Sequence, residues 1–150
     1  MRRARIAILV GATLGVVGAS QGSDIEQARR AWWNAHVRPV LQNGRAYSAV
    51  QNAQNSIESA VLDQGDYSKL TPRFLSRWEP GFRWVAGNRG KVGQIAVETE
   101  PKKYRIAATS ATGHVYSITR AANGSIVRRC QPGCTFDPGS PPPAPASLRQ

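Results

Sequence analysis

With 150 residues, the chain has room for one hydrophobic core and little for a second. Its 20 basic and 9 acidic residues give a net charge of +11, which suits nucleic acid, acidic polysaccharide or an anionic membrane surface as a partner. The Lys and Arg residues are spread along the chain and form no continuous tract. We therefore expect one basic domain and ascribe most of its charge to an ordinary solvated surface.

The first 19 residues have the three parts of an export signal. MRRAR is a positive start, 6–18 is an apolar run, and Val17 and Ala19 place small residues before a cleavage after Ala19. The run is short for a membrane-spanning helix, which needs about 20 apolar residues. We expect 1–19 to be a signal peptide, with a short membrane anchor as the alternative. Either places the protein outside the cytoplasm, secreted or associated with the cell surface.

Helical spacing dominates the next part of the chain. Ser23 and Glu26 make a capping box, which predicts a helix over 23–38. A second helix is expected over 46–64, or a single long helix interrupted near Pro39.

The helix over 46–64 is amphipathic. Its apolar stripe consists of Ala46, Val50, Ala53, Ile57, Ala60 and Val61. The other side is polar, with Gln51, Asn52, Gln54, Asn55 and Glu58. Gly65 stands where a left-handed helix stop is expected.

Two adjacent tryptophans, Trp32 and Trp33, lie in the first helical segment. Both cannot point fully inward from one helix, so one is exposed or meets a partner. They are the candidate partner contacts of the chain.

The second half has the pattern of a small sheet. Thr71 followed by Pro72 predicts a short capped helix. The glycine-rich segment 87–93 is expected to be a loop. Alternation with a period of two and the hairpin signal Asn123-Gly124 then predict four antiparallel strands, near 95–100, 104–108, 114–119 and 125–129. The expected fold is α+β: a long, kinked N-terminal helix packed on a four-stranded antiparallel β-meander. We assign 20–136 to this domain and 137–150 to a Pro-rich disordered tail.

Cys130 and Cys134 are the two cysteines of the chain, in CQPGC. Two cysteines around a Pro-Gly turn favour a short structural disulfide in an oxidising compartment. A redox pair would have two intervening residues instead of three, and a zinc site would need both His36 and His114.

No catalytic signature stands out, and we expect no enzyme, no cofactor and no metal. A weak alternative is a nuclease that uses His114 with Arg120 and Lys103. Asp63 and Asp66 could bind calcium, but helix-end and turn chemistry explains them better.

Four segments are similar to bacterial type IV pilin-like proteins, including pseudopilins. They are AVQNAQNSIESAVLDQGDYSKLT, LSRWEPGFRW, KYRIAATSATGHVYSITR and the terminal CQPGC. The likeness covers about 46–134 and rests on the order of loose motifs. It implies a helix laid across an antiparallel sheet, and a subunit role in a cell-surface filament or secretion system.

The chain departs from that family at its N-terminus. A Gly-Phe-Thr-Leu-x-Glu-type junction and an early Glu are missing, and the first acidic residue is Asp24. The resemblance therefore does not extend to processing by a prepilin peptidase or to ordinary filament polymerisation. The partners we expect are other pilus or secretion-system proteins, with the membrane as a partner only if the N-terminal segment stays uncleaved.

The alternative function is a secreted basic module that binds DNA or an acidic cell-wall polymer. Its candidate polyanion contacts are Arg83, Arg89, Lys91, Lys102, Lys103 and Arg105.

Overall fold

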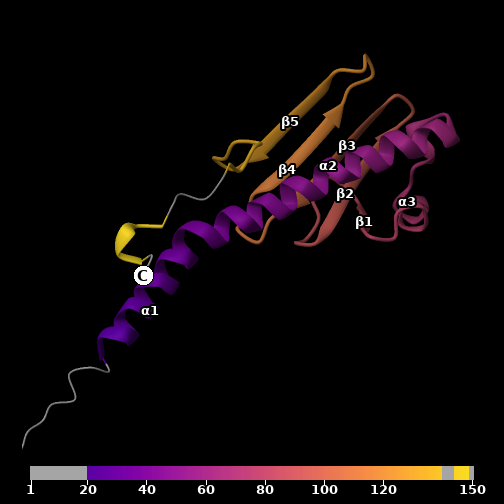
Figure 1. Cartoon of the computed structure of the whole chain (residues 1–150). Coiled ribbons are helices and arrows are strands. Elements are labelled where there is room, and N and C mark those ends of the chain that lie inside the picture. Colours follow the sequence, from indigo (N-terminus) through magenta and orange to yellow (C-terminus); the bar gives the residue numbers. More distant parts are fainter. Residues whose placement is uncertain (1–19, 140–143, 149–150) are drawn as a thin grey trace, which may run out of the picture.

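The computed structural model describes residues 20–139 and 144–148 (Figure 1). The predicted signal peptide or anchor, 1–19, lies outside them. The helical elements are α1 (Ser20–Trp32), the π-helical turn η1 (Trp33–Val37), α2 (Arg38–Gln64), the 3-10 turn η2 (Tyr67–Lys69), α3 (Pro72–Trp78) and the 3-10 turn η3 (Ala146–Leu148). The strands are β1 (Arg83–Ala86), β2 (Gln94–Glu100), β3 (Lys103–Thr109), β4 (Val115–Arg120) and β5 (Ile126–Gln131). The predicted α+β class is confirmed.

One uninterrupted helix runs from α1 through η1 into α2 (Figure 1). It already includes Ser23, so the predicted start at the capping box is wrong, as is a division into two helices. Pro39 does not end the helix, because the backbone widens just before it. The Arg38 N–H donates to the carbonyl of Trp33, five residues back. A wide turn of this kind accommodates a proline that would clash in a regular α-helix.

The end of α2 and the start of α3 have the capping interactions that the sequence predicts. Gly65 has φ = 77°, and its N–H donates to the Val61 carbonyl at 2.7 Å. Thr71 Oγ1 accepts from the Phe74 N–H at 3.2 Å and caps α3, with Pro72 at the first position. These local predictions are confirmed.

The sheet is mixed and has five strands in the order β1-β2-β3-β4-β5. β1 pairs with β2 in parallel, and the remaining neighbours pair antiparallel. A four-stranded antiparallel sheet is therefore not confirmed: the four predicted strands correspond to β2–β5, and β1 is an additional edge strand. Four residues are too few to reveal a strand by alternation.

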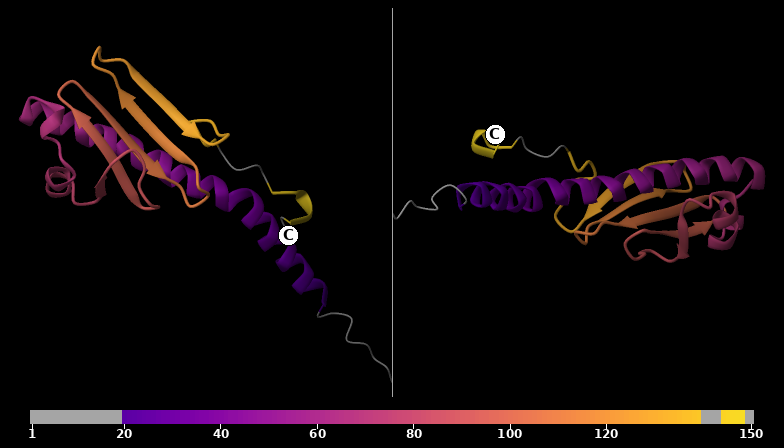
Figure 2. Two further views of the ribbon diagram at one scale, coloured as in Figure 1. Left: turned by 180° about the vertical axis from the view of Figure 1, so that it is seen from behind. Right: turned by 60° about the horizontal axis from the view of Figure 1, so that its bottom comes forward.

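α2 covers one face of the sheet and forms the core with it (Figure 2). The stripe residues Ala46, Val50, Ala53, Ile57 and Ala60 are buried as predicted, and Val61 is half-buried. Facing them are the buried sheet residues Ile95, Val97, Tyr104, Ile106, Ala108, Tyr116 and Ile118. Leu70, Leu75 and Trp84 belong to the same core.

The connection between β1 and β2 crosses the opposite face of the sheet, which we call the far face. The Asn88 carbonyl accepts from Arg105 Nη1 at 2.7 Å, and the Gly90 carbonyl from Thr109 Oγ1 at 2.7 Å. The predicted loop over 87–93 is thus present and tied to the sheet. The buried small residues of this face are Ala96, Ala107 and Ser117.

Of the predicted C-terminal tail, the structure describes 137–139 and 144–148. Phe136, just before it, packs edge-on against Tyr47 and Tyr116 at centroid distances of 5.2 and 6.1 Å. Further on, η3 contacts α1.

Candidate functional site

The N-terminal part of the long helix extends past the end of the sheet (Figures 1 and 2). We call residues 22–45 the helical arm, because the buried stripe of α2 begins at Ala46. At 1.5 Å per residue, the arm is about 36 Å long. Its large exposed apolar side chains are Ile25 (42% exposed), Trp33 (50%) and Leu41 (47%). Ile25 and Trp33 lie in the part of the arm before the sheet. Leu41 instead lines an open hollow with Phe82, and Asn43 Oδ1 accepts a hydrogen bond from Thr112 Oγ1 in the β3–β4 turn.

The two tryptophans have different surroundings. Trp32 is half-buried, and its ring stacks on His36 at a centroid distance of 5.4 Å. His36 Nδ1 also donates to the Trp32 carbonyl at 3.0 Å, which gives this histidine a structural role. Trp33 is therefore the stronger candidate contact of the pair.

Strand pairing places several arginines on the far face. Successive side chains of a strand point to opposite faces. Val85, Ala96, Ala107, Ser117 and Arg129 are paired across the five strands in one row. Arg83 and Arg105 lie two residues from this row and share its face. Arg89 belongs to the loop that crosses it.

The structure brings only part of the predicted polyanion set together. Arg83, Arg89 and Arg105 all lie on the far face, where Arg89 and Arg105 line one hollow and Arg83 lies two strands away from Arg105. Lys91 lies in the same crossing loop as Arg89. Lys102 lies in the turn between β2 and β3. Lys103 is also at that end, where its Nζ is 2.9 Å from Glu100 Oε1. Arg129 was missed, because only the register of β5 with β4 puts it on this face.

A polar cluster joins α2 to the sheet. Glu58 Oε2 accepts from the Tyr67 hydroxyl and Oε1 from the Tyr104 hydroxyl, both at 2.8 Å. Arg120 Nη1 lies 3.4 Å from Glu58 Oε1, and its guanidinium lies over the Tyr67 ring at 5.8 Å. Nearby, Arg128 donates to Gln54 Oε1 at 3.3 Å.

This cluster corrects one prediction and shifts two pKa values. Gln54 is buried and Glu58 half-buried against the sheet, so their assignment to the outward polar side is wrong. Long polar side chains beside an apolar stripe can reach across it to a partner. Burial, reinforced by the hydrogen bond to Glu58, raises the pKa of Tyr67 to about 12 and that of Tyr104 further still.

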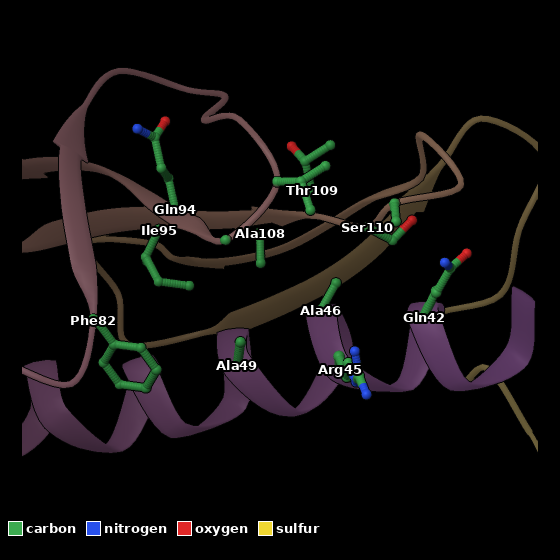
Figure 3. A pocket seen from close by; sticks show the side chains of 13 residues that line it. Gln42, Arg45, Ala46, Ala49, Phe82, Gln94, Ile95, Ala108, Thr109 and Ser110 are labelled. Atoms are coloured by element: carbon green, nitrogen blue, oxygen red, sulfur yellow. The ribbon is translucent and has the colours of Figure 1, made fainter. Parts of the chain in front are cut away.

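An apolar hollow of about 380 Å³ lies between α2 and the ends of β2 and β3 (Figure 3). Ala46 and Ala49 line it from the helix, Ile95 and Ala108 from the sheet, and Phe82 closes one side. The hollow exists because alanines face each other where the helix and sheet could hold larger side chains. No ligand chemistry follows from this lining alone.

The remaining predicted residues have local roles. Cys130 and Cys134 form the predicted disulfide, with Cα atoms 5.4 Å apart. His114 precedes β4 and Arg120 ends it, so the structure separates these two proposed nuclease groups along the strand. Asp66 Oδ1 accepts from the Ser68 N–H and hydroxyl at 2.6 and 2.5 Å, and these bonds hold the pKa of Asp66 below its usual value.

In the described ranges, 20–139 and 144–148, no group of three or more His, Cys, Asp or Glu side chains could hold a metal ion. The same part of the chain contains no helix that combines the length and the apolar character needed to cross a bilayer.

No family model, curated protein or solved structure matches the chain. The likeness to type IV pilins therefore remains a resemblance of motifs, and the functional argument rests on the geometry described above.

Proposed function

We propose that this protein is an exported, non-enzymatic pilin-like subunit or adaptor of a cell-surface pilus or secretion system. In this role it acts through protein–protein contacts at the cell envelope. The observation that carries the proposal is the helical arm, which extends past the sheet with Ile25, Trp33 and Leu41 exposed.

An exposed helix with large apolar side chains is a typical docking element. Aromatic residues contribute most to such interfaces, because they bury a large rigid surface at a small cost in side-chain entropy. Trp33 has this character. The globular body supplies a rigid base, since α2 continues from the arm without a break into the buried core.

The test compares two surface changes in the cell that produces the protein. The double variant Ile25→Ser/Trp33→Ser alters the arm, and Leu62→Ser alters an apolar side chain that is 84% exposed at the other end of the helix. We expect the unchanged chain and Leu62→Ser to co-fractionate with surface filaments or the envelope secretion machinery. The double variant should appear as unassembled protein.

Two results would contradict the proposal. One is an unchanged chain found only as a free monomer, and the other is equal assembly of the arm variant and the Leu62→Ser control. Sequencing the N-terminus of the exported protein then distinguishes a soluble adaptor from an anchored subunit. Cleavage after Ala19 indicates the soluble adaptor, and an intact N-terminus in the membrane fraction indicates the anchored subunit.

A further inference from the structure

We infer that the far face of the sheet binds the phosphate backbone of duplex nucleic acid, independently of base sequence. The binding surface consists of Arg83, Arg89, Arg105 and Arg129, which we call the arginine surface. This inference does not depend on the pilin-like proposal, because it concerns a different surface, the sheet face that points away from α2.

The four arginines come from three strands and the crossing loop, and the fold places them on one face of the sheet. Arg83, Arg105 and Arg129 lie on alternate strands, β1, β3 and β5. Neighbouring strands are about 4.8 Å apart, so the strands that carry these arginines are about 10 Å apart and span about 19 Å. That span equals the length of about six base pairs, which rise 3.4 Å each.

The charges of this surface are available for a ligand. Within the described residues, the guanidinium groups of Arg83, Arg89 and Arg129 have no hydrogen-bond or ion-pair partner. Arg105 donates one hydrogen bond to the Asn88 carbonyl, which fixes its position beneath the crossing loop and leaves its other N–H groups for an anion.

The shape of the far face also suits a broad anionic partner. An open hollow of about 460 Å³ lies beside Arg89 and Arg105, with Asn88 and Gln131 as further polar lining residues. The middle of the face, formed by Ala96, Ala107 and Ser117, is buried, and the crossing loop is tied to the same face, so a ligand would contact the face around the loop. Of the acidic residues of the strands on this face, Glu98 is paired directly with Arg105 and offsets part of its charge, whereas Glu100 lies next to the β2–β3 turn, away from Arg83.

Two features favour duplex phosphates over other polyanions. The surface is built of arginines, whose planar guanidinium binds phosphate oxygens in pairs. The strand residues of the far face include no aromatic side chain, whereas proteins that bind single strands stack bases on aromatic rings. Contacts to phosphates alone carry no direct base readout.

The test measures the binding of the full chain to a labelled 20-base-pair duplex between 50 and 200 mM salt. Four phosphate contacts give a slope of about −3.6 in log K against log salt, and therefore an affinity loss of about 100-fold over this range. The triple variant Arg83→Gln/Arg89→Gln/Arg129→Gln should reduce the slope by about 3. Arg105 is left intact because it also holds the crossing loop.

A charge-matched control is the triple variant Arg45→Gln/Arg73→Gln/Arg77→Gln. These arginines are also exposed but lie on α2 and α3, away from the far face. We expect the control to change the slope by less than one. The N-terminal arginines are present in all three proteins, so their contribution cancels.

Several outcomes would overturn the inference. These are no binding of the unchanged chain at 50 mM salt, an equal loss of slope in both triple variants, and at least tenfold tighter binding of the corresponding single strand. Polyglutamate that competes as well as the duplex at equal charge would also overturn it. Equal binding of a duplex with a shuffled sequence would support it.

Discussion

At the scale of single residues, Glu58 shows how one polar side chain can fasten a helix to a sheet. It accepts hydrogen bonds from Tyr67 and Tyr104 and lies beside Arg120, so the hydroxyls that the core buries are satisfied. A buried hydroxyl without a partner costs about 1–3 kcal/mol. The sequence did not reveal this role, because Glu58 was assigned with its polar neighbours to the outward side of the helix, and its partners Tyr104 and Arg120 are distant in sequence.

The raised pKa of Tyr67 makes stability depend on pH in the alkaline range. Its pKa is about 12 in the folded chain and 10.0 in the reference state, so above pH 10 the unfolded state loses the Tyr67 proton first. Stability therefore falls as the pH rises from 10 to 12, by up to about 1.4 kcal/mol per pH unit for this group.

We expect Tyr67→Phe to be less stable than the unchanged chain at pH 8, by about 1 kcal/mol for the lost hydrogen bond. The difference should shrink and then reverse between pH 10 and 12, because the variant lacks this titration. Urea unfolding at a series of pH values measures both effects. If the free energies of unfolding of the two proteins changed in parallel over that range, this would contradict the raised pKa of Tyr67.

At the scale of elements, the features that could be predicted from the sequence are those that depend on residues close together in the chain. The apolar stripe from Ala46 to Ala60, the stop at Gly65 and the cap at Thr71 all follow from local spacing or local hydrogen bonds, and all are present. β1 and the far face were not predicted. β1 is short and pairs in parallel, and the far-face arginines meet only through the strand register.

Replacing Gly90 and Gly44 by alanine compares the cost of tight packing at one position with the gain in helix propensity at the other. A Cβ on Gly90 would lie 3.1 Å from Gln94 Cβ and 3.3 Å from Val85 Cγ2, because the crossing loop lies tightly on the sheet. A Cβ on Gly44 would meet nothing within 4 Å, and this glycine is inside α2.

Gly90→Ala should therefore destabilise the protein by about 1 kcal/mol or more through overpacking. Gly44→Ala should stabilise it by about 0.5–1 kcal/mol, since alanine has the better helix propensity. Chemical denaturation of both variants measures the difference. Effects of the same sign would contradict the close approach of the loop to the sheet.

At the scale of the whole molecule, stability is distributed unevenly along the long helix. α2 packs on the sheet, whereas the contacts of α1 are with η1 and η3. α1 is continuous with α2 but lacks the tertiary packing that supplies most of the stability of a helix in a protein. The arm therefore depends on the body, or on a partner, for its order.

We expect amide hydrogens of α1 to exchange by local opening, much faster than those of residues 50–60 in the core part of α2. Hydrogen exchange of the unassembled chain, followed by mass spectrometry or NMR, measures this. If the arm assembles as proposed, its amides gain protection in the assembly. Equal protection of α1 and α2 in the monomer would show that the arm is held by the body itself.

The π-helical turn has a geometric consequence for any partner of the arm. Each residue of an α-helix advances the side-chain direction by about 100°, and η1 contains a hydrogen bond that spans five residues where an α-helix spans four. The added residue therefore affects the direction around the helix axis in which Trp33 and Ile25 point relative to the sheet. Deleting Ala35 would replace the wide turn by an ordinary α-helical turn, in which Pro39 would clash, so the junction between arm and body would be disturbed and a partner that contacts both would bind less well.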